Sequence, residues 1–272
     1  MSDQTIHIAG RPIGPGHPPY VIAEMSGNHN GDIERAFALL QAAKDAGADA
    51  VKMQTYTADT ITIDHDGPQF LIEGGLWGGR RLYELYQQAH TPWDWHPALF
   101  ERARALGVTL FSSPFDPTAI DLLESLDAPA YKIASFEIVD LPLIGRAART
   151  GKPLVISTGM ADREEIAEAV DAARTAGARE IVLLHCTSGY PTPPEDSNLR
   201  TIPDLAAAFD AIVGLSDHTL GTSVAVAAIA LGAAVIEKHF TLDRNADQQE
   251  EIVDAGFSLN PDELRRMIED CR

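Results

Sequence analysis

The sequence predicts a single α/β domain of the parallel (β/α)₈ (TIM) barrel class. Three observations support this: eight short apolar runs rich in strand formers, helical patterns between them, and no glycine-rich dinucleotide loop after the first run. The runs are apolar on both faces, which is typical of parallel strands that are covered on both sides. An open doubly wound sheet is the alternative architecture. A length of 272 residues suits one barrel domain.

The expected elements alternate regularly along the chain. The eight expected strands are 21–25, 50–55, 108–113, 130–135, 153–158, 181–186, 211–216 and 234–240. Between them, one helix begins at Asp32 and stops at Gly47, a residue type that often ends helices. Another begins at Asp162, a capping residue followed by first-turn acids, and ends near Gly177. A last helix is expected over 261–269.

The segment 57–92, between the second strand and its helix, breaks this rhythm. It is far longer than an ordinary βα loop and contains aromatic residues and glycines, among them Trp77 and Gly78. We expect a lid or specificity loop over the barrel mouth. A surface ornament without function is the alternative.

Charge and cysteine content narrow the classes of function. Lys and Arg number 21 against 40 Asp and Glu, a net charge of −19, which argues against nucleic-acid or anionic-membrane partners. Two cysteines, Cys186 and Cys271, cannot form a disulfide framework, so we expect a reducing compartment, the cytoplasm. The first ten residues lack a signal-peptide pattern, and no run of eighteen apolar residues predicts a membrane span.

Polar residues gather at the carboxyl ends of all eight expected strands, where parallel barrels carry their chemistry. One such serine is compatible with a turn or a cap, but the joint pattern predicts an active site. The candidates are Glu24, Lys52, Gln54, Ser113, Lys132, Ser135, Glu137, Ser157, Tyr190, Ser216, His218 and His239.

Lys52 and Lys132 stand inside apolar strands, where an inward ammonium group is costly unless its charge is used. A Schiff-base nucleophile and a binding site for a phosphate or carboxylate both fit. The neighbouring hydroxyl groups of Ser113 and Ser135 favour the anion site. Lysines that point outward between the helices are the structural alternative.

His218 and His239 follow neighbouring strands and lie 21 residues apart. Neighbouring strands are about 4.8 Å apart, so the two imidazoles can share one divalent ion. Two nitrogen ligands plus water and substrate oxygens suit Mn²⁺ or Mg²⁺ rather than a closed zinc site. Hydrogen-bonded structural histidines are the alternative. Glu24 and Glu137 are either acid/base groups or salt-bridge partners of the lysines.

Several strings are recognisable as a set: IAEMSGNHNGD, VKMQTYT, FSSPFD, YKIASFE, STGM, CTSGYP, GLSDHT and EKHFTLDR. In this order, over about residues 20–259, they resemble the sialic acid synthase family. The resemblance implies a (β/α)₈ enzyme that condenses phosphoenolpyruvate with an N-acylated amino-hexose to a nine-carbon 2-keto sugar acid and phosphate. The segment 76–96 is most similar to the branch that makes pseudaminic acid from 2,4-diacetamido-2,4,6-trideoxy-altrose. The N-acetylneuraminate and legionaminate branches are alternatives.

The resemblance also implies a role for each candidate. His218 and His239 would hold the divalent cofactor, Mn²⁺ or Mg²⁺, and Glu24, Lys52 and Glu137 would be catalytic, with Glu137 as the acid/base or water-orienting carboxylate. The residues that would hold phosphoenolpyruvate are Lys52, Ser113, Lys132, Ser135, Ser157 and Ser216. The residues that would face the sugar are Glu24, Gln54, Tyr190 and Asp254.

Two features depart from the family pattern. The family usually continues into a small antifreeze-like C-terminal domain that gives the partner of a homodimer an arginine for the sugar. This sequence ends at Arg272, directly after the last expected helix, so we expect a single barrel over 1–272 without that domain. Arg80 or Arg81 is a candidate substitute for the arginine, and the segment 245–254 lacks the family's glycine-proline-aspartate phrase. A Schiff-base aldolase and a non-catalytic barrel remain competing interpretations.

Overall fold

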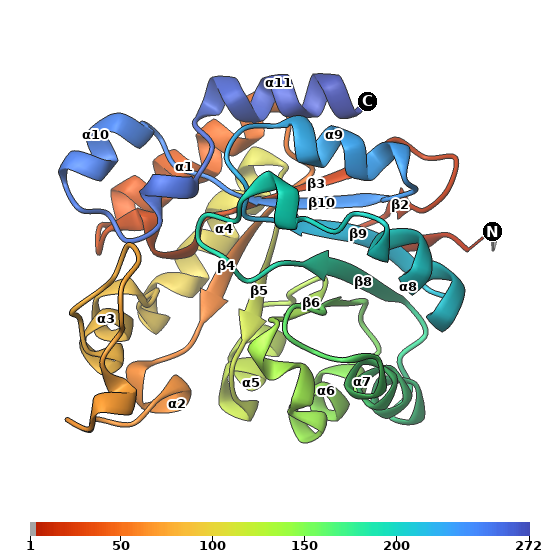
Figure 1. Ribbon diagram of the computed structural model, residues 1–272, viewed down its shortest axis with the longest axis horizontal. Helices are drawn as coiled ribbons and strands as arrows, with labels where there is room; N and C mark the ends of the chain where they lie inside the picture. The colour runs from red at the N-terminus through yellow and green to blue at the C-terminus, as the bar shows by residue number, and fades with distance from the viewer. Residues whose placement is uncertain (1–3) are drawn as a thin grey trace.

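The computed structural model describes residues 4–272 and contains a closed barrel of eight parallel strands (Figure 1). The strands are β3 (Tyr20–Glu24), β4 (Ala50–Thr55), β5 (Thr109–Pro114), β6 (Tyr131–Ile133), β7 (Leu154–Ser157), β8 (Ile181–Cys186), β9 (Ile212–Asp217) and β10 (Val235–His239). They pair in sequence order, and β10 closes the barrel against β3. The predicted fold class is confirmed, and every expected strand is present.

One helix follows each barrel strand and belongs to the outer ring. These helices are α1 (Ile33–Ala46), α4 (His96–Leu106), α5 (Pro117–Ser125), α6 (Leu141–Ala148), α7 (Arg163–Thr175), α8 (Thr201–Phe209), α9 (Ser223–Ala230) and α11 (Pro261–Cys271). The predicted starts are confirmed: the Asp32 carboxylate caps α1, and the Asp162 carboxylate caps α7. Gly47 ends α1 with a φ of 95°, which glycine adopts without a steric penalty.

A short antiparallel hairpin precedes the barrel and was not predicted. It consists of β1 (Ile6–Ile8) and β2 (Arg11–Ile13). Ile6, Ile8 and Ile13 are buried in the same apolar cluster as the inward side chains of the strands, including Ala50 and Ile212 at the strand starts. The hairpin therefore covers the amino-terminal end of the barrel and leaves the opposite end for the site.

The segment 57–92 is partly helical rather than a plain loop. It contains α2 (Ala58–Ile61), a 3₁₀ turn η2 (Pro68–Phe70) and α3 (Leu82–Ala89), and a second 3₁₀ turn η3 (Trp93–Trp95) follows. Figure 1 shows α2 and α3 on the same side of the barrel as α10 (Arg244–Gln249), which follows β10. The remaining short turns are η1 (Ser26–His29), η4 (Phe136–Val139), η5 (Pro194–Asp196) and η6 (Ala255–Phe257).

Two further expectations concern membrane-spanning helices and disulfide bonds. Within residues 4–272, none of the helices combines the length and the apolar character that crossing a bilayer requires. Cys186 and Cys271 are both buried, and both are free thiols.

Candidate active site

The polar residues at the strand ends divide into two sets, because successive residues of a strand point to opposite faces. Lys52, Lys132 and Glu237 point into the barrel, where both lysines contact Glu237. Asp217 and Lys238 point outward and form an ion pair of 2.7 Å under the helices, with both side chains almost fully buried. The polar residues at the strand ends therefore belong partly to the barrel interior and partly to the layer between the strands and the outer helices.

Two lysines and two carboxylates form the centre of the inward set. The Lys52 Nζ lies 2.7 Å from the Glu24 Oε2. The Glu237 Oε1 lies 3.1 Å from the Lys132 Nζ and 3.6 Å from the Lys52 Nζ, and it accepts a hydrogen bond of 3.2 Å from the Ser216 hydroxyl. All five residues are at most 4% exposed. The alternative of outward lysines is wrong for both, and Glu24 is indeed a salt-bridge partner of Lys52.

The charges in this cluster shift one another's pKa values. Burial alone would lower the pKa of Lys52, but Glu237 and Glu24 outweigh it and raise the pKa. For Lys132 burial prevails over Glu237, and the pKa is lowered. Burial raises the pKa of Glu24 against the pull of Lys52, whereas for Glu237 the two ammonium groups overcome burial and lower the pKa. An anionic ligand at the lysines therefore competes with an ionised Glu237.

Hydroxyl groups lie beside the lysines. The Lys52 Nζ donates to the Ser113 Oγ over 3.4 Å. The Ser157 hydroxyl is buried and has no hydrogen-bond partner within residues 4–272. A Cβ at Gly159 would come within 2.8 Å of the Ser135 Oγ and 2.7 Å of the Ser188 Oγ, so glycine leaves room for both hydroxyl groups. Hydroxyl donors and ammonium groups therefore lie together, a combination that suits the acceptor oxygens of a phosphate or carboxylate.

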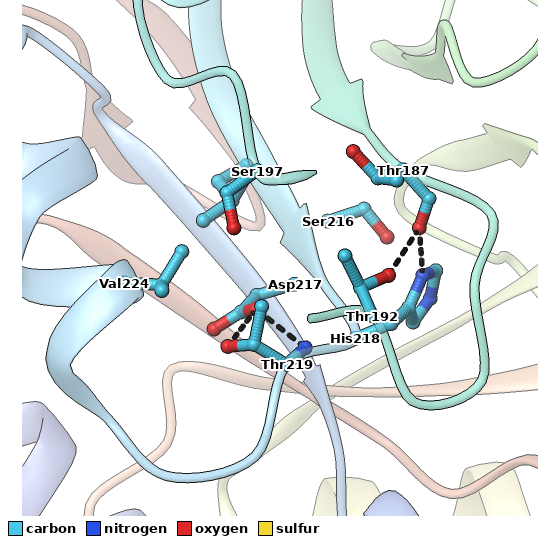
Figure 2. A pocket seen from close by; sticks show the side chains of 9 residues that line it. Thr187, Thr192, Ser197, Ser216, Asp217, His218, Thr219 and Val224 are labelled. Carbon is cyan, nitrogen blue, oxygen red and sulfur yellow. Dashed lines mark hydrogen bonds between the residues drawn. The ribbon is translucent and has the colours of Figure 1, made fainter. Parts of the chain in front are cut away.

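His218 and His239 stand next to each other at the ends of β9 and β10, with ring centroids 5.4 Å apart. The His218 Nδ1 lies 3.0 Å from the Thr187 carbonyl oxygen, which assigns the proton to Nδ1 and leaves Nε2 free as a ligand. Figure 2 shows this contact, together with the Thr192 hydroxyl that donates to the same carbonyl. The spatial pairing that the spacing predicted is therefore present.

The second imidazole is suited to a metal in another way. The His239 Nδ1 is buried, has no hydrogen bond within residues 4–272, and lies 3.9 Å from an oxygen of Asp254. Burial lowers the pKa of His239 well below its ordinary value, so the ring is neutral, as a metal ligand must be. Across the described part of the chain no cluster of three or more His, Cys, Asp or Glu side chains could hold an ion. The residues fit an open site with two imidazole ligands, which leaves positions for water and substrate oxygens. Burial alone would lower the pKa of His218, but contacts with Cys186 and Thr187 outweigh burial and raise the pKa, so a metal ion competes with a proton at that ring.

The turn that carries His218 is braced from outside the barrel. The Lys238 Nζ donates to the Asp217 carboxylate over 2.7 Å and to the Thr219 carbonyl over 2.6 Å. The other oxygen of Asp217 accepts the Thr219 N–H and hydroxyl, as Figure 2 shows. Asp217 and Lys238 immediately precede the two histidines, so this ion pair ties together the two strand ends that carry the imidazoles.

A hydrogen-bonded series leads from Glu24 to Asp254. The Gln54 amide donates to the Glu24 Oε1 over 3.0 Å and to the Ser26 hydroxyl over 3.4 Å. The Ser26 hydroxyl in turn donates to the Asp254 carboxylate. Tyr190 lies next to His218, with their ring centroids 4.4 Å apart. Of the four predicted sugar-side residues, Tyr190 and Asp254 therefore lie beside the imidazoles, and Gln54 and Glu24 are connected to Asp254 through Ser26.

Glu137 lies on η4, just after β6. One oxygen of its carboxylate is buried and unpartnered within the described residues, and burial raises its pKa to about 7. Lys132 is close enough to lower that pKa against the effect of burial, but no ion pair joins the two side chains. A carboxyl group that titrates near neutrality is suited to proton transfer.

Arg80 and Arg81 form their contacts inside the segment 57–92. Arg81 pairs with Asp64 over 3.1 Å and also with Asp66, and Arg80 donates to Gln88.

Glu237 is the important residue that the sequence analysis did not select. Its signal was available in the period of the strand: if His239 points inward, the residue two positions earlier points inward as well. The same rule assigns Lys238 to the outer layer.

The chain is similar to proteins of known family along most of its length. The model of the NeuB family matches residues 39–272. The chain belongs to the NeuB family. It is 46% identical to pseudaminic acid synthase of Helicobacter pylori over 93% of this chain and 73% of that protein. It is 37% identical to N,N'-diacetyllegionaminic acid synthase of Legionella pneumophila over 96% of this chain and 74% of that one.

A solved structure supports the NeuB-family barrel directly. The N-acetylneuraminic acid synthetase of Leptospira borgpetersenii, in complex with citrate, superposes with a TM-score of 0.88 at 30% identity. The match covers 98% of this chain and 87% of that structure. The family resemblance seen in the sequence strings is therefore confirmed.

Proposed function

We propose that this chain is a phosphoenolpyruvate-dependent nonulosonic acid synthase of the pseudaminic acid branch. Its substrates are phosphoenolpyruvate and an N-acylated amino-hexose, 2,4-diacetamido-2,4,6-trideoxy-altrose, and its products are pseudaminic acid and phosphate. One observation carries the proposal: two inward lysines and a pair of imidazoles meet in the mouth of a NeuB-family barrel. The 46% identity to pseudaminic acid synthases supports the choice of branch.

In this proposal the lysine side of the mouth binds phosphoenolpyruvate. Lys52 and Lys132 are the cations within reach of its phosphate and carboxylate, and the hydroxyl groups satisfy further oxygens. The hydroxyl donors are Ser113, Ser135, Ser157 and Ser216. The ligand competes with Glu237 for both ammonium groups, so Glu237 sets how strongly the anion is held.

The imidazole side binds the open-chain sugar. His218 and His239 would hold Mn²⁺ or Mg²⁺, which would polarise the aldehyde carbonyl. Tyr190 and Asp254, which lie beside the imidazoles, and Gln54 would orient the sugar, and Glu24 links Gln54 to Lys52. Alignment of both substrates in a buried mouth contributes much of the rate.

The reaction then follows from these positions. Carbon 3 of phosphoenolpyruvate forms a bond to the aldehyde carbon, and positive charge develops at carbon 2. The electron pair of the aldehyde carbonyl bond moves onto its oxygen, which takes up a proton and becomes a hydroxyl group. Water adds to carbon 2, and Glu137 takes its proton, as a carboxylate with a pKa of about 7 can do near neutral pH. The tetrahedral intermediate expels phosphate through cleavage of its carbon–oxygen bond, and the lysines stabilise the departing anion.

The proposal extends to the state of the enzyme in the cell. We infer a cytoplasmic location, which the two free thiols support. We also infer a homodimer. Large apolar side chains on loops that follow the strands, Phe136, Val139, Met160 and Leu220, are 51–70% exposed, which supports a contact at the barrel mouth. Analytical ultracentrifugation measures this state.

The experiment is to supply phosphoenolpyruvate, Mn²⁺ and a panel of N-acylated hexoses, and to follow phosphate release. The panel contains the diacetamido-trideoxy-altrose sugar, N-acetylmannosamine and the diacetamido-trideoxy-mannose sugar. Release with the first sugar alone supports the pseudaminic acid branch. Release with another sugar alone contradicts the branch, and release with none contradicts the synthase activity.

A further inference from the structure

The segment 57–92 contains, just before α3, a small hairpin whose tip reaches toward the site. Leu71 pairs with Arg81 in an antiparallel bridge, and the Ile72 N–H donates to the Arg80 carbonyl over 2.9 Å. Contacts of Arg81 with acidic residues hold the base of this hairpin. Its tip contains several glycines with positive φ, Gly74, Gly75 and Gly79, and these allow the chain to turn tightly.

Trp77 joins this tip to the segment after β10. Its indole Nε1 donates to the Val253 carbonyl over 2.7 Å, directly beside Asp254. Its ring lies 5.6 Å from that of Tyr190 and 6.4 Å from that of Phe257. The tip is therefore packed against residues that surround the imidazoles.

Two aromatic rings connect Trp77 with the imidazoles. Tyr190 lies 4.4 Å from His218, and Phe257 lies 4.7 Å from His239, measured between ring centroids. Trp77 is the outermost member of this set and is only partly buried. A hexose whose aldehyde carbon lies at the imidazoles extends its carbon chain outward, because the lysine cluster occupies the interior. The far end of the sugar then contacts the aromatic set of Trp77, Tyr190 and Phe257, with Trp77 outermost.

The Trp77 face of this set is apolar, with the Gln248 amide and the Tyr190 hydroxyl as its polar neighbours. The single donor of Trp77 is already bound to the Val253 carbonyl. Leu76 next to it packs on the backbone of the 3₁₀ turn, where a Cβ at Gly256 would come within 3.2 Å of a Leu76 methyl carbon. Phe257 adds a further apolar ring. A hydroxyl group packed on the indole face of Trp77 would lose its water without gaining a partner from that ring.

We propose that Trp77 is a specificity-determining residue whose indole packs on the terminal methyl group of a 6-deoxy sugar and disfavours a sugar with a C6 hydroxyl group. The assignment rests on the proposed function, since it takes the aldehyde to lie at the imidazoles. An apolar surface distinguishes a 6-deoxy sugar from its 6-hydroxy counterpart only moderately, by about ten- to a hundredfold in kcat/KM.

The test compares 2,4-diacetamido-2,4,6-trideoxy-altrose with its 6-hydroxy counterpart. Wild type should prefer the 6-deoxy sugar by about ten- to a hundredfold. Trp77→Ala should reduce that preference to less than about threefold, mainly through a higher KM for the 6-deoxy sugar. Trp77→Phe, which keeps an apolar ring and loses the hydrogen bond to Val253, should retain most of the preference. Thermal unfolding checks that each variant is folded.

Trp93→Phe is the matched control, because the Trp93 indole also donates to a backbone carbonyl, that of Tyr56, over 3.2 Å. It should leave the sugar preference unchanged. An unchanged preference in Trp77→Ala, with both sugars still turned over, overturns the assignment and leaves the proposed function intact. If wild type releases phosphate with neither sugar, the proposed function fails and the assignment fails with it.

Discussion

Replacement of Glu237 tests how far its carboxylate stabilises the buried ammonium groups of Lys52 and Lys132. Its Oε1 lies 3.1 Å from the Lys132 Nζ and 3.6 Å from the Lys52 Nζ, and the side chain is 4% exposed. In Glu237→Gln two buried ammonium groups share one remaining carboxylate, that of Glu24. Removal of one partner from a buried ion pair costs about 3–5 kcal/mol. We therefore expect the free energy of unfolding to fall by about that amount.

The assay is thermal unfolding with and without phosphoenolpyruvate. For a protein of this size 1 kcal/mol corresponds to about 2–4 °C, so the midpoint should fall by about 6–20 °C. Phosphoenolpyruvate should raise the midpoint of Glu237→Gln more than that of wild type, because the ligand supplies the missing negative charge. Glu101→Gln, an exposed carboxylate on α4, is the control and should change the midpoint little. A Glu237→Gln midpoint within about 2 °C of wild type would refute the reasoning.

Three further predictions address the other groups of the site. Wild-type kcat should rise with pH near 7 as the Glu137 carboxyl loses its proton, and Glu137→Gln should remove that rise; a variant profile that keeps the rise contradicts the assignment. His218→Ala and His239→Ala should each abolish both turnover and the rise in unfolding midpoint caused by Mn²⁺, with the circular dichroism spectrum unchanged; a retained Mn²⁺ effect argues against the two-imidazole site. Borohydride with pyruvate should attach no mass to Lys52 or Lys132, whereas a trapped adduct would indicate a Schiff-base aldolase.

The barrel was predictable from local patterns. Runs that are apolar on both faces mark parallel strands, and residues such as Asp32, Gly47 and Asp162 mark helix ends through capping chemistry. Inward lysines could be expected because an apolar strand otherwise has no use for an ammonium group.

The remaining features depend on contacts between distant parts of the chain. The hairpin at residues 6–13 is too short for a strong local pattern, and its burial depends on strand starts that come later in the sequence. The partner of Lys132 is Glu237, 105 residues away; the strand period indicates that Glu237 points inward, but not which lysine it contacts. Likewise, the contact of Trp77 with the Val253 carbonyl joins residues that are 176 positions apart.

One measurement tests the central claim most directly: the fate of the bridging oxygen of phosphoenolpyruvate. The enzyme is incubated with Mn²⁺, the diacetamido-trideoxy-altrose sugar, and phosphoenolpyruvate that carries ¹⁸O between carbon 2 and phosphorus. Carbon–oxygen cleavage at the lysine cluster predicts that the label leaves with phosphate and that a nine-carbon 2-keto acid forms alongside it. Label retained in the keto acid, or no phosphate at all, would contradict the account.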